Sequence, residues 1–393
     1  MNILYMTADT GGGHVKAAQA LMHQSEKQIP GCKSMLVDSL KFISPAINKI
    51  ITGTYHKTIK SAPFLYGKLY DLSEDGDFIT DIAKAFNGLL SGRLNKLFMQ
   101  YRFDAAVCAH TIPLQMLASL KRRGLLNIPV IGLVTDYAHH SFWNVAEADA
   151  FIVAHEDVKK DMVKMGIDEE KVFAFGIPVA EEFLKPGNRY VLLNKMGFKD
   201  KPTLLLMGGS LGFGEMLPLF SALISIARDI QIIAVAGHNK KLKYQMENIV
   251  NKRNGFNSSN IRIFGYTDKI SELMDIADII ITKPGGITVS EALVKNLPII
   301  ITRPIPGQEE RNARFLTQSG AAVRLHSCSE LENILQKMLD RPFTLRRMSK
   351  AAGKLARPNA SANIARLLEE FVMKAPYSER VNLPFPVAIS AKS

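Results

Sequence analysis

Short, continuously apolar runs recur along the chain, with longer stretches of helical character between them. The runs lack the alternation of apolar and polar side chains that a half-exposed strand shows. Strands buried on both faces of a parallel sheet have this pattern, and the helical stretches supply the crossovers that parallel strands require. We predict strands at Asn2–Thr7, Ala105–Ala109, Pro129–Thr135, Ala150–Ala154, Thr203–Met207, Ile230–Ala236, Ile261–Phe264, Ile279–Thr282 and Pro298–Thr302.

The length and the turn residues indicate two domains. A chain of 393 residues is longer than one ordinary core needs, and strand–helix alternation on this scale predicts two doubly wound α/β domains. Proline and glycine gather within 178–202, and a new strand with a new glycine turn follows. We therefore expect an N-terminal domain over 1–180, a C-terminal domain over 200–350 and a loose tail over 382–393.

Charge and composition narrow the class of partner. The net charge of +12 favours an anionic partner. Because no helix-turn-helix, zinc-finger or RNP-like pattern occurs, a nucleotide or an acidic lipid is preferred over nucleic acid. The three cysteines have neither disulfide nor zinc spacing, which indicates a reducing compartment. Without a signal-peptide pattern or an apolar run of roughly 20 residues, we expect a cytoplasmic protein or one bound to the cytosolic face of a membrane.

The first glycine cluster follows the first predicted strand. Gly11, Gly12 and Gly13 precede His14 and a helix that we predict from about Val15. Glycine lets the backbone approach a ligand, and a helix N-terminus supplies unpaired N–H groups and a positive dipole end. Histidine titrates near neutrality, so His14 is a candidate general base. The alternative is a tight turn in which His14 only caps the helix.

A second glycine loop follows the strand predicted at Thr203–Met207. Residues 208–214 read GGSLGFG, and so many small residues in one place favour a ligand-binding loop over a purely structural turn. We predict that Gly209 and its neighbours form a diphosphate cradle, to which Ser210 adds a hydroxyl donor.

A third loop follows Ile279–Thr282 and leads into a helix. Lys283 is placed to face the diphosphate, and Glu291 lies early in the helix, where a carboxylate can accept both hydroxyls of a ribose. The alternative is a glutamate that only matches the helix dipole. The other residues of the motif that we expect at the donor site are Gly285, Gly286 and Thr288.

Polar residues also follow the strand predicted at Pro298–Thr302. Residues 304–312 read PIPGQEERN, which puts polar side chains at the carboxyl edge of a parallel sheet, where ligands bind in doubly wound folds. A polar surface loop explains this segment equally well.

Residues 40–70 combine apolar and aromatic side chains, among them Phe42 and Tyr55, with five lysines, Lys41, Lys49, Lys57, Lys60 and Lys68. A basic amphipathic segment can lie on an anionic bilayer surface. An ordinary helix that packs its apolar face inward has the same periodicity, so both interpretations stand. A second basic stretch, 341–354, is interpreted as the solvated face of a helix.

Four separated motifs, taken together, resemble the diacylglycerol glycosyltransferases, which include bacterial processive glucosyltransferases and plant monogalactosyldiacylglycerol synthases. A more distant likeness is to the GlcNAc transferase that makes lipid II. The resemblance covers about residues 1–372, and the motifs occur in the family's order. They are Gly-Gly-Gly-His at 11–14, Thr135-Asp136 with His140 and Trp143, Lys-Pro-Gly-Gly-Ile-Thr at 283–288 with Glu291-Ala292, and Pro-Gly-Gln-Glu at 306–309 with Asn312.

The resemblance implies a GT-B fold, in which two Rossmann-like domains face each other across a cleft, with a helix at about 355–375 packing back on the N-terminal domain. It implies His14 as the base toward the acceptor hydroxyl and Asp136 as a residue that orients or replaces it. His140 and Trp143, with Phe42 and Tyr55 of the amphipathic segment, are expected on the acceptor side. The resemblance implies Gly13 as a further donor-binding residue. It implies Gly209 and Ser210 at the diphosphate, Phe264, Gly265 and Tyr266 at the uracil, Glu291 at the ribose, and Gln308, Glu309 and Asn312 at the sugar and phosphate.

The function implied in this way is inverting transfer of a hexose from a UDP-sugar to a lipid, diacylglycerol above all, at the inner face of the cell membrane. UDP-sugar is then a substrate, and neither a cofactor nor a metal is implied. Asp75-Gly76-Asp77 has the Asp-x-Asp pattern of metal-dependent glycosyltransferases, but it lies in an acidic loop and is interpreted as solvated. Two rival functions stay open: transfer to a soluble acceptor, and UDP-sugar sensing without turnover.

Overall fold

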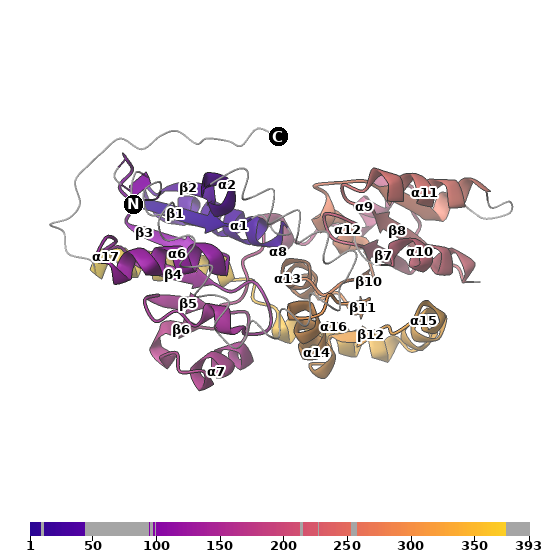
Figure 1. Ribbon diagram of the computed structural model, residues 1–393. Helices are drawn as coiled ribbons and strands as arrows, with labels where there is room; N and C mark the ends of the chain where they lie inside the picture. Colours follow the sequence, from indigo (N-terminus) through magenta and orange to yellow (C-terminus); the bar gives the residue numbers. More distant parts are fainter. Residues whose placement is uncertain are drawn as a thin grey trace. The chain divides into compact units, whose positions relative to one another are not determined.

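The chain divides into two compact units in the computed structural model (Figure 1). Unit 1 comprises Met1–Ala180 together with helix α17 (Ala360–Lys374), and unit 2 comprises Glu181–Pro358. The structure describes residues 1–8, 12–43, 94, 97–98, 100–212, 215–226, 228–252 and 258–374.

Unit 1 is built on a six-stranded sheet whose paired strands are all parallel, in the order β2-β1-β3-β4-β5-β6. Its described elements are β1 (Asn2–Thr7), α1 (Gly13–Gln28), β2 (Lys33–Asp38), α2 (Ser39–Ile43), β3 (Ala105–Cys108), α6 (Thr111–Arg122), β4 (Val130–Leu133), η2 (Ser141–Trp143), β5 (Ala150–Ile152), α7 (Glu156–Lys164), η3 (Glu169–Lys171), β6 (Val172–Phe173) and α17.

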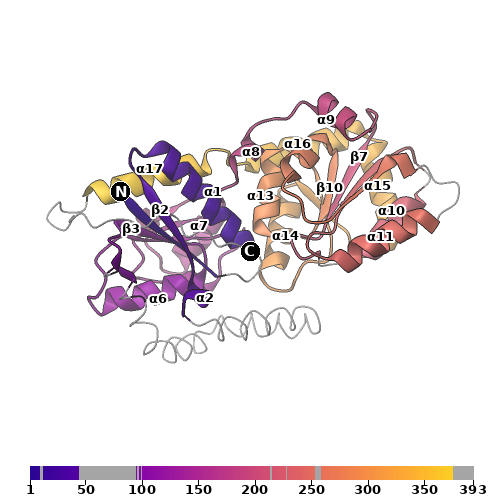
Figure 2. The same cartoon turned by 90° about the horizontal axis from the view of Figure 1, so that it is seen from above.

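Helices cover both faces of this sheet. The chain passes from β1 through α1 to β2 in one direction and from β3 through α6 to β4 in the other, so right-handed crossovers place α1 and α6 on opposite faces, as Figure 2 shows. Helix α17 packs beside α1 and β3, and the amide of Gln28 donates to the carbonyl of Ala362 over 3.2 Å. The last helix of the chain therefore belongs to the N-terminal core.

Unit 2 repeats the plan with a second parallel sheet in the order β12-β11-β10-β7-β8-β9. Its described elements are α8 (Glu181–Leu184), α9 (Arg189–Lys195), β7 (Thr203–Met207), α10 (Met216–Ser225), β8 (Gln231–Val235), α11 (Lys240–Lys252), η4 (Ser258–Asn260), β9 (Ile261–Phe264), α12 (Ile270–Ile276), β10 (Ile279–Thr282), α13 (Gly286–Val294), β11 (Ile299–Ile301), α14 (Gln308–Gln318), β12 (Ala322–Arg324), η5 (Cys328–Glu330), α15 (Leu331–Leu339) and α16 (Pro342–Leu355).

Burial explains why the apolar runs form central strands. Every residue of β3, β4, β5, β7, β8, β10 and β11 is buried, so a continuous apolar run is stabilised on both faces of the sheet. Each sheet packs its own core, with Leu117 and Phe151 in unit 1 and Phe220 and Ile281 in unit 2. The doubly wound α/β fold expected from the sequence is confirmed.

The pattern of apolar runs does not predict three strands, namely β2, β6 and β12. Strand β2 lies at the edge of its sheet, and none of its six residues is fully buried, so polar and apolar side chains mix along it. Strands β6 and β12 are also edge strands and have only two and three residues. Edge position and shortness thus remove the signal on which the prediction depends.

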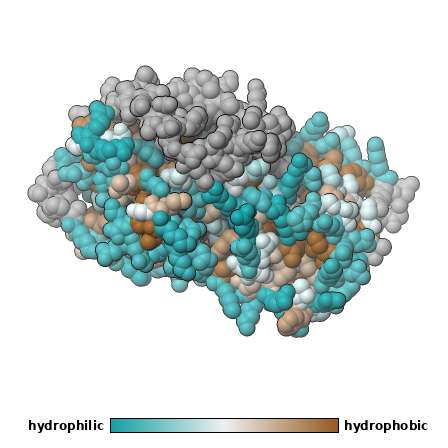
Figure 3. Space-filling view, turned by 60° about the horizontal axis from the view of Figure 1, so that its bottom comes forward, coloured by the Kyte–Doolittle hydropathy of each residue, from teal (hydrophilic) through white to brown (hydrophobic). Residues whose placement is uncertain are grey.

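The view in Figure 3 shows a mostly hydrophilic described surface with small hydrophobic patches. Scattered apolar residues such as Tyr190 and Tyr244 contribute to the exposed surface. None of the helices in the described part of the chain is both long enough and apolar enough to cross a membrane. Most of the amphipathic segment 40–70, including Tyr55, and the Asp75–Asp77 motif lie outside the described residues.

Candidate functional site

Unit 1 has a topological switch point between β1 and β3. The chain leaves β1 toward β2 on one side, while β3 and the later strands lie on the other side. In doubly wound folds, ligands bind at the carboxyl edge of the sheet at such a switch point. Helix α1 begins there at Gly13, after Gly12 at φ 79°, a left-handed conformation that favours glycine.

His14, the second residue of α1, lies at this switch point and is partly exposed. Its Nδ1 lies 2.7 Å from the hydroxyl oxygen of Thr135, which follows β4 and is buried. Burial lowers the pKa of His14, although the charge of Asp136 and a hydrogen bond to the backbone of Ala109 act in the opposite direction. The imidazole is thus held on one side and kept largely uncharged near neutral pH, as a general base requires.

His110 also belongs to this group, and no sequence motif predicts it. It follows β3, caps helix α6 and packs edge-on against His14, with ring centroids 4.9 Å apart at an interplanar angle of 78°. Burial is the larger cause that lowers the pKa of His110 well below its usual range, and the charge of the neighbouring His14 is the smaller one. A signal for it exists only in three dimensions, because β3 is the spatial neighbour of β1.

The residues expected on the acceptor side occupy different environments. His140 is buried and caps η2 through its Nδ1, which accepts from the amide of Phe142 over 3.1 Å. Trp143 is also buried and belongs to the unit 1 core, against which Phe42 of α2 packs as a partly buried side chain. Their contact with an acceptor stays a prediction.

Unit 2 has its own switch point, between β7 and β10. The Gly209 and Lys283 loops follow these two strands and meet, since a Cβ on Gly209 would lie 3.2 Å from the side-chain Cε of Lys283. Gly209 has φ +70°, and the N-cap of α13 is Gly285, which has no side chain with which to cap the helix. Backbone N–H groups and one ammonium therefore converge, as an anion site requires.

We expect Gly209→Ala to weaken UDP binding and to lower stability by about 1–2 kcal/mol through left-handed strain. The new methyl group would displace Lys283 from the cradle. Gly124→Ala is the matched control, because Gly124 has φ +67° and an added Cβ there would meet no described atom within 4 Å. Calorimetric titration with UDP and thermal unfolding measure both effects. Equal UDP affinity in the two variants would contradict the cradle.

Two buried side chains fix the loop after β10. The ammonium of Lys283 pairs with the carboxylate of Glu309, whose other oxygen accepts from the amide of Ile305 over 3.0 Å. The amide of Asn312, fully buried, donates to the carbonyl of Pro284 over 3.0 Å. Asn312 and Glu309 thus secure the turns around the site, and their direct contact with a sugar stays a prediction.

The remaining predicted donor residues lie along the same carboxyl edge or in helices that start there. Thr288 and Glu291 are in α13, with Glu291 buried, and the partly exposed Gln308 is the first residue of α14. Each helix presents its N-terminus at this edge, so each dipole favours an anion there.

An aromatic stack stands at the ends of β8 and β9. The rings of His238 and Tyr266 lie parallel, 4.1 Å apart at 15°, and Tyr266 remains 58% exposed. The amide of His238 donates to the carbonyl of Ser210 over 2.8 Å, which joins the stack to the glycine loop after β7. Sequence reasoning finds Phe264, Gly265 and Tyr266 through the family resemblance but misses His238, which has no motif of its own.

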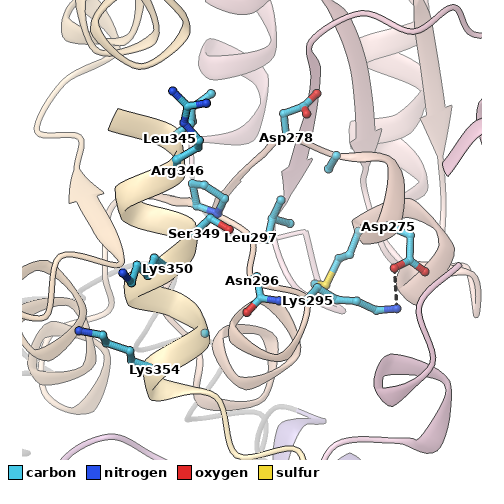
Figure 4. Close-up of a pocket in the computed structure, with 14 residues that line it drawn as sticks. Asp275, Asp278, Lys295, Asn296, Leu297, Leu345, Arg346, Ser349, Lys350 and Lys354 are labelled. Atoms are coloured by element: carbon cyan, nitrogen blue, oxygen red, sulfur yellow. Dashed lines mark hydrogen bonds and ion pairs between the residues drawn. The ribbon is translucent and has the colours of Figure 1, made fainter. Parts of the chain in front are cut away.

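An open groove of roughly 680 Å³ lies at the opposite, amino edge of the unit 2 sheet, beside Asp278 and Pro298. In Figure 4 the ammonium groups of Lys350 and Lys354 on α16 point away from the Lys295–Asp275 pair, whose Nζ–Oδ1 distance is 2.7 Å. This arrangement fits the solvated helix face expected for 341–354.

Among the described residues, no group of three or more His, Cys, Asp or Glu side chains is arranged to hold a metal ion.

Two family models match this chain, one in its N-terminal part and one in its C-terminal part. Residues 14–179 match the family model for monogalactosyldiacylglycerol (MGDG) synthase, and residues 203–364 match the model for the C-terminal domain of glycosyltransferase family 28. The processive diacylglycerol beta-glucosyltransferase of Bacillus cereus strain AH187 is 32% identical over 365 residues, which cover 92% of each chain. That of Bacillus mycoides strain KBAB4 is 30% identical over 394 residues, covering 100% of this chain and 98% of the relative.

The fold has known counterparts. The crystal structure of Acinetobacter baumannii MurG matches with a TM-score of 0.60 at 19% identity, covering 94% of this chain and 99% of that one. This likeness concerns the fold, and with the two parallel sheets it confirms the expected GT-B class. From the identity to relatives along nearly its whole length and from the two family models, the chain belongs to the diacylglycerol glycosyltransferases of family 28.

Proposed function

We propose that this protein transfers a hexose from a UDP-sugar to the free hydroxyl of diacylglycerol, with inversion at the anomeric carbon. One observation carries the proposal: His14, held at Nδ1 by Thr135 and with a lowered pKa, stands at the carboxyl edge of a unit that matches the MGDG synthase family. The curated relatives are named as beta-glucosyltransferases that act on diacylglycerol, which supports both the acceptor and the inverted product.

The proposed step transfers one proton to His14 and releases one leaving group, UDP. The acceptor oxygen bonds to the anomeric carbon as neutral His14 takes the hydroxyl proton, and the bond to UDP breaks with its electron pair on the diphosphate. Asp136, whose charge acts on His14, stabilises the resulting imidazolium. Lys283 and the N-terminus of α13 stabilise the leaving diphosphate. The step requires the His14 group and the unit 2 site to reach the same sugar.

The strand order of unit 2 supports one orientation of the UDP-sugar along the carboxyl edge of the sheet. Along its carboxyl edge the α14 loop follows β11, the glycine cradle with Lys283 follows β10 and β7, and the His238–Tyr266 stack follows β8 and β9. Neighbouring strands lie about 4.8 Å apart, so hexose, diphosphate and uracil fit these three places in turn. The exposed ring of Tyr266 suits stacking with a base.

We place the reaction at the inner surface of the cell membrane, with the protein bound peripherally. Diacylglycerol resides in the bilayer because its two acyl chains are apolar, so the enzyme must meet it there. The net charge of +12 attracts the chain to an anionic surface. Vesicle co-sedimentation separates this proposal from transfer to a soluble acceptor, for which membrane binding is not needed.

The function is tested by incubating the protein with UDP-glucose, UDP-galactose or UDP-GlcNAc and vesicles that contain diacylglycerol. We expect at least one donor to give a hexosyl-diacylglycerol detected by mass spectrometry, together with an equal amount of UDP. Tight UDP binding without glycolipid or UDP release from any donor would favour a sensing function instead. A glycosylated soluble additive with untouched diacylglycerol would overturn the proposed acceptor.

Glu291→Ala is expected to weaken UDP-sugar binding by about 1–3 kcal/mol, the value of a hydrogen bond to a charged group. The buried carboxylate lies on α13 next to the cradle, where we propose that it binds the ribose. Comparing UDP with 2′,3′-dideoxy-UDP isolates this contact, because the variant should lose most of its preference for UDP. An unchanged preference would remove Glu291 from the ribose site.

A further inference from the structure

We propose that His110 is a positioning residue for His14: its neutral ring stands against the His14 ring, holds it in place and shields it from water. The inference rests on the proposed function, in which His14 accepts the proton of the acceptor hydroxyl. His110 itself neither gives nor takes that proton.

The local hydrogen bond fixes the tautomer of His110. Its Nδ1 accepts from the backbone amide of Ile112 over 3.1 Å. Because an amide N–H can only donate, Nδ1 carries no proton, and the neutral ring keeps its proton on Nε2. Protonating His110 would cost this cap bond and would place a positive charge beside His14. Helix α6 therefore locks His110 in its neutral form.

The ring of His14 is held on two flanks by this arrangement. His110 packs edge-on with a centroid distance of 4.9 Å, and the Thr135 hydroxyl meets Nδ1 at 2.7 Å. Among the titratable groups of the described residues, Asp136, from the loop after β4, acts on the charge of His14, and His14 in turn acts on the charge of His110 at the start of α6. Asp136 favours the imidazolium form of His14. Burial of the His14 ring, to which we propose that His110 contributes, favours the neutral form.

A base must be unprotonated, and burial lowers the pKa of His14, so the enzyme keeps its activity to a lower pH than a solvated histidine would allow. Removing the His110 ring admits water, which relieves the burial and raises the pKa of His14 toward its ordinary value. The acid limb of the pH–rate profile then moves to higher pH.

The experiment uses His110→Asn, because the asparagine oxygen can still accept from the Ile112 amide and preserve the cap of α6. We expect kcat to fall about tenfold through lost positioning, and the acid limb to move to higher pH as the pKa of His14 rises. UDP affinity should not change. The matched control is His155→Asn: His155 caps α7 in the same way, accepting from the amide of Asp157 over 3.3 Å, and its substitution should leave the profile unchanged.

A direct titration keeps the test independent of turnover. The full chain with ¹³C-labelled histidine gives ring signals whose pH dependence reports each pKa, and a His14→Gln spectrum assigns the His14 signal. We expect His110→Asn, but not His155→Asn, to raise the pKa of His14. An unmoved His14 pKa in a folded His110→Asn variant overturns the inference, whereas a wild type that transfers no sugar contradicts the proposed function alone.

Discussion

Replacing His14 with alanine is expected to lower the rate of sugar transfer by about 10²–10⁴-fold while UDP affinity stays unchanged. The magnitude is that of a lost general base. The affinity is retained because the imidazole belongs to unit 1, with Thr135 and His110, whereas the proposed diphosphate contacts belong to unit 2. Initial rates of UDP release in the presence of diacylglycerol vesicles, with calorimetric UDP titration, measure both quantities.

His23→Ala is the matched control for this variant. His23 lies exposed on the same helix α1, so its loss should leave both the rate and the UDP affinity as in the wild type. If His14→Ala retained full transfer, another group would be the base, and Asp136 would be the first to test. A parallel loss of UDP affinity and thermal stability would instead make His14 a structural residue.

Replacing Lys283 with methionine is expected to weaken UDP binding about 10- to 100-fold and to lower stability by about 3 kcal/mol. The ammonium pairs with Glu309, whose side chain is only 7% exposed, so the variant leaves a buried carboxylate without its cation. The carboxylate would then stand beside Gly285 in the proposed diphosphate cradle, where it repels the ligand. Thermal unfolding and UDP titration measure the two losses.

A second substitution and a control separate the two effects. Adding Glu309→Gln to Lys283→Met removes the uncompensated charge, so stability should recover while UDP binding stays weak. Lys295→Met breaks a comparably buried pair, with Asp275 at 2.7 Å, at the amino edge of the same unit. It should lower stability and leave UDP affinity intact. A double variant that bound UDP as well as the wild type would exclude Lys283 from the diphosphate site.

Much of the fold can be predicted from the sequence because its central strands are buried on both faces. The apolar runs at Asn2–Thr7, Thr203–Met207 and Ile279–Thr282 coincide with the central strands β1, β7 and β10, and the run at Ile261–Phe264 coincides with β9, an edge strand. The prediction at Pro129–Thr135 extends beyond β4 because Val134 and Thr135 are still buried after the strand has ended. There the hydroxyl of Thr135 meets His14, so burial alone does not separate a strand from a site.

The candidate site is less accessible to sequence reasoning. Gly209 and Lys283 belong to separate motifs, and only the strand order, which places β7 beside β10, brings them together. His110 and His238 have no motif, because the role of each depends on a partner supplied by another strand. Asn312 has a motif, but its buried hydrogen bond to Pro284 shows a task within the loop that no spacing reveals.

The anomeric configuration of the product tests the central claim most directly. UDP-α-glucose labelled with ¹³C at the anomeric carbon is incubated with the wild-type protein and diacylglycerol vesicles, and the glycolipid is examined by NMR. A single displacement assisted by the His14 base predicts a β-glucosyl-diacylglycerol, with a large coupling between the protons on carbons 1 and 2. An α-linked product would require a different mechanism and would contradict the account.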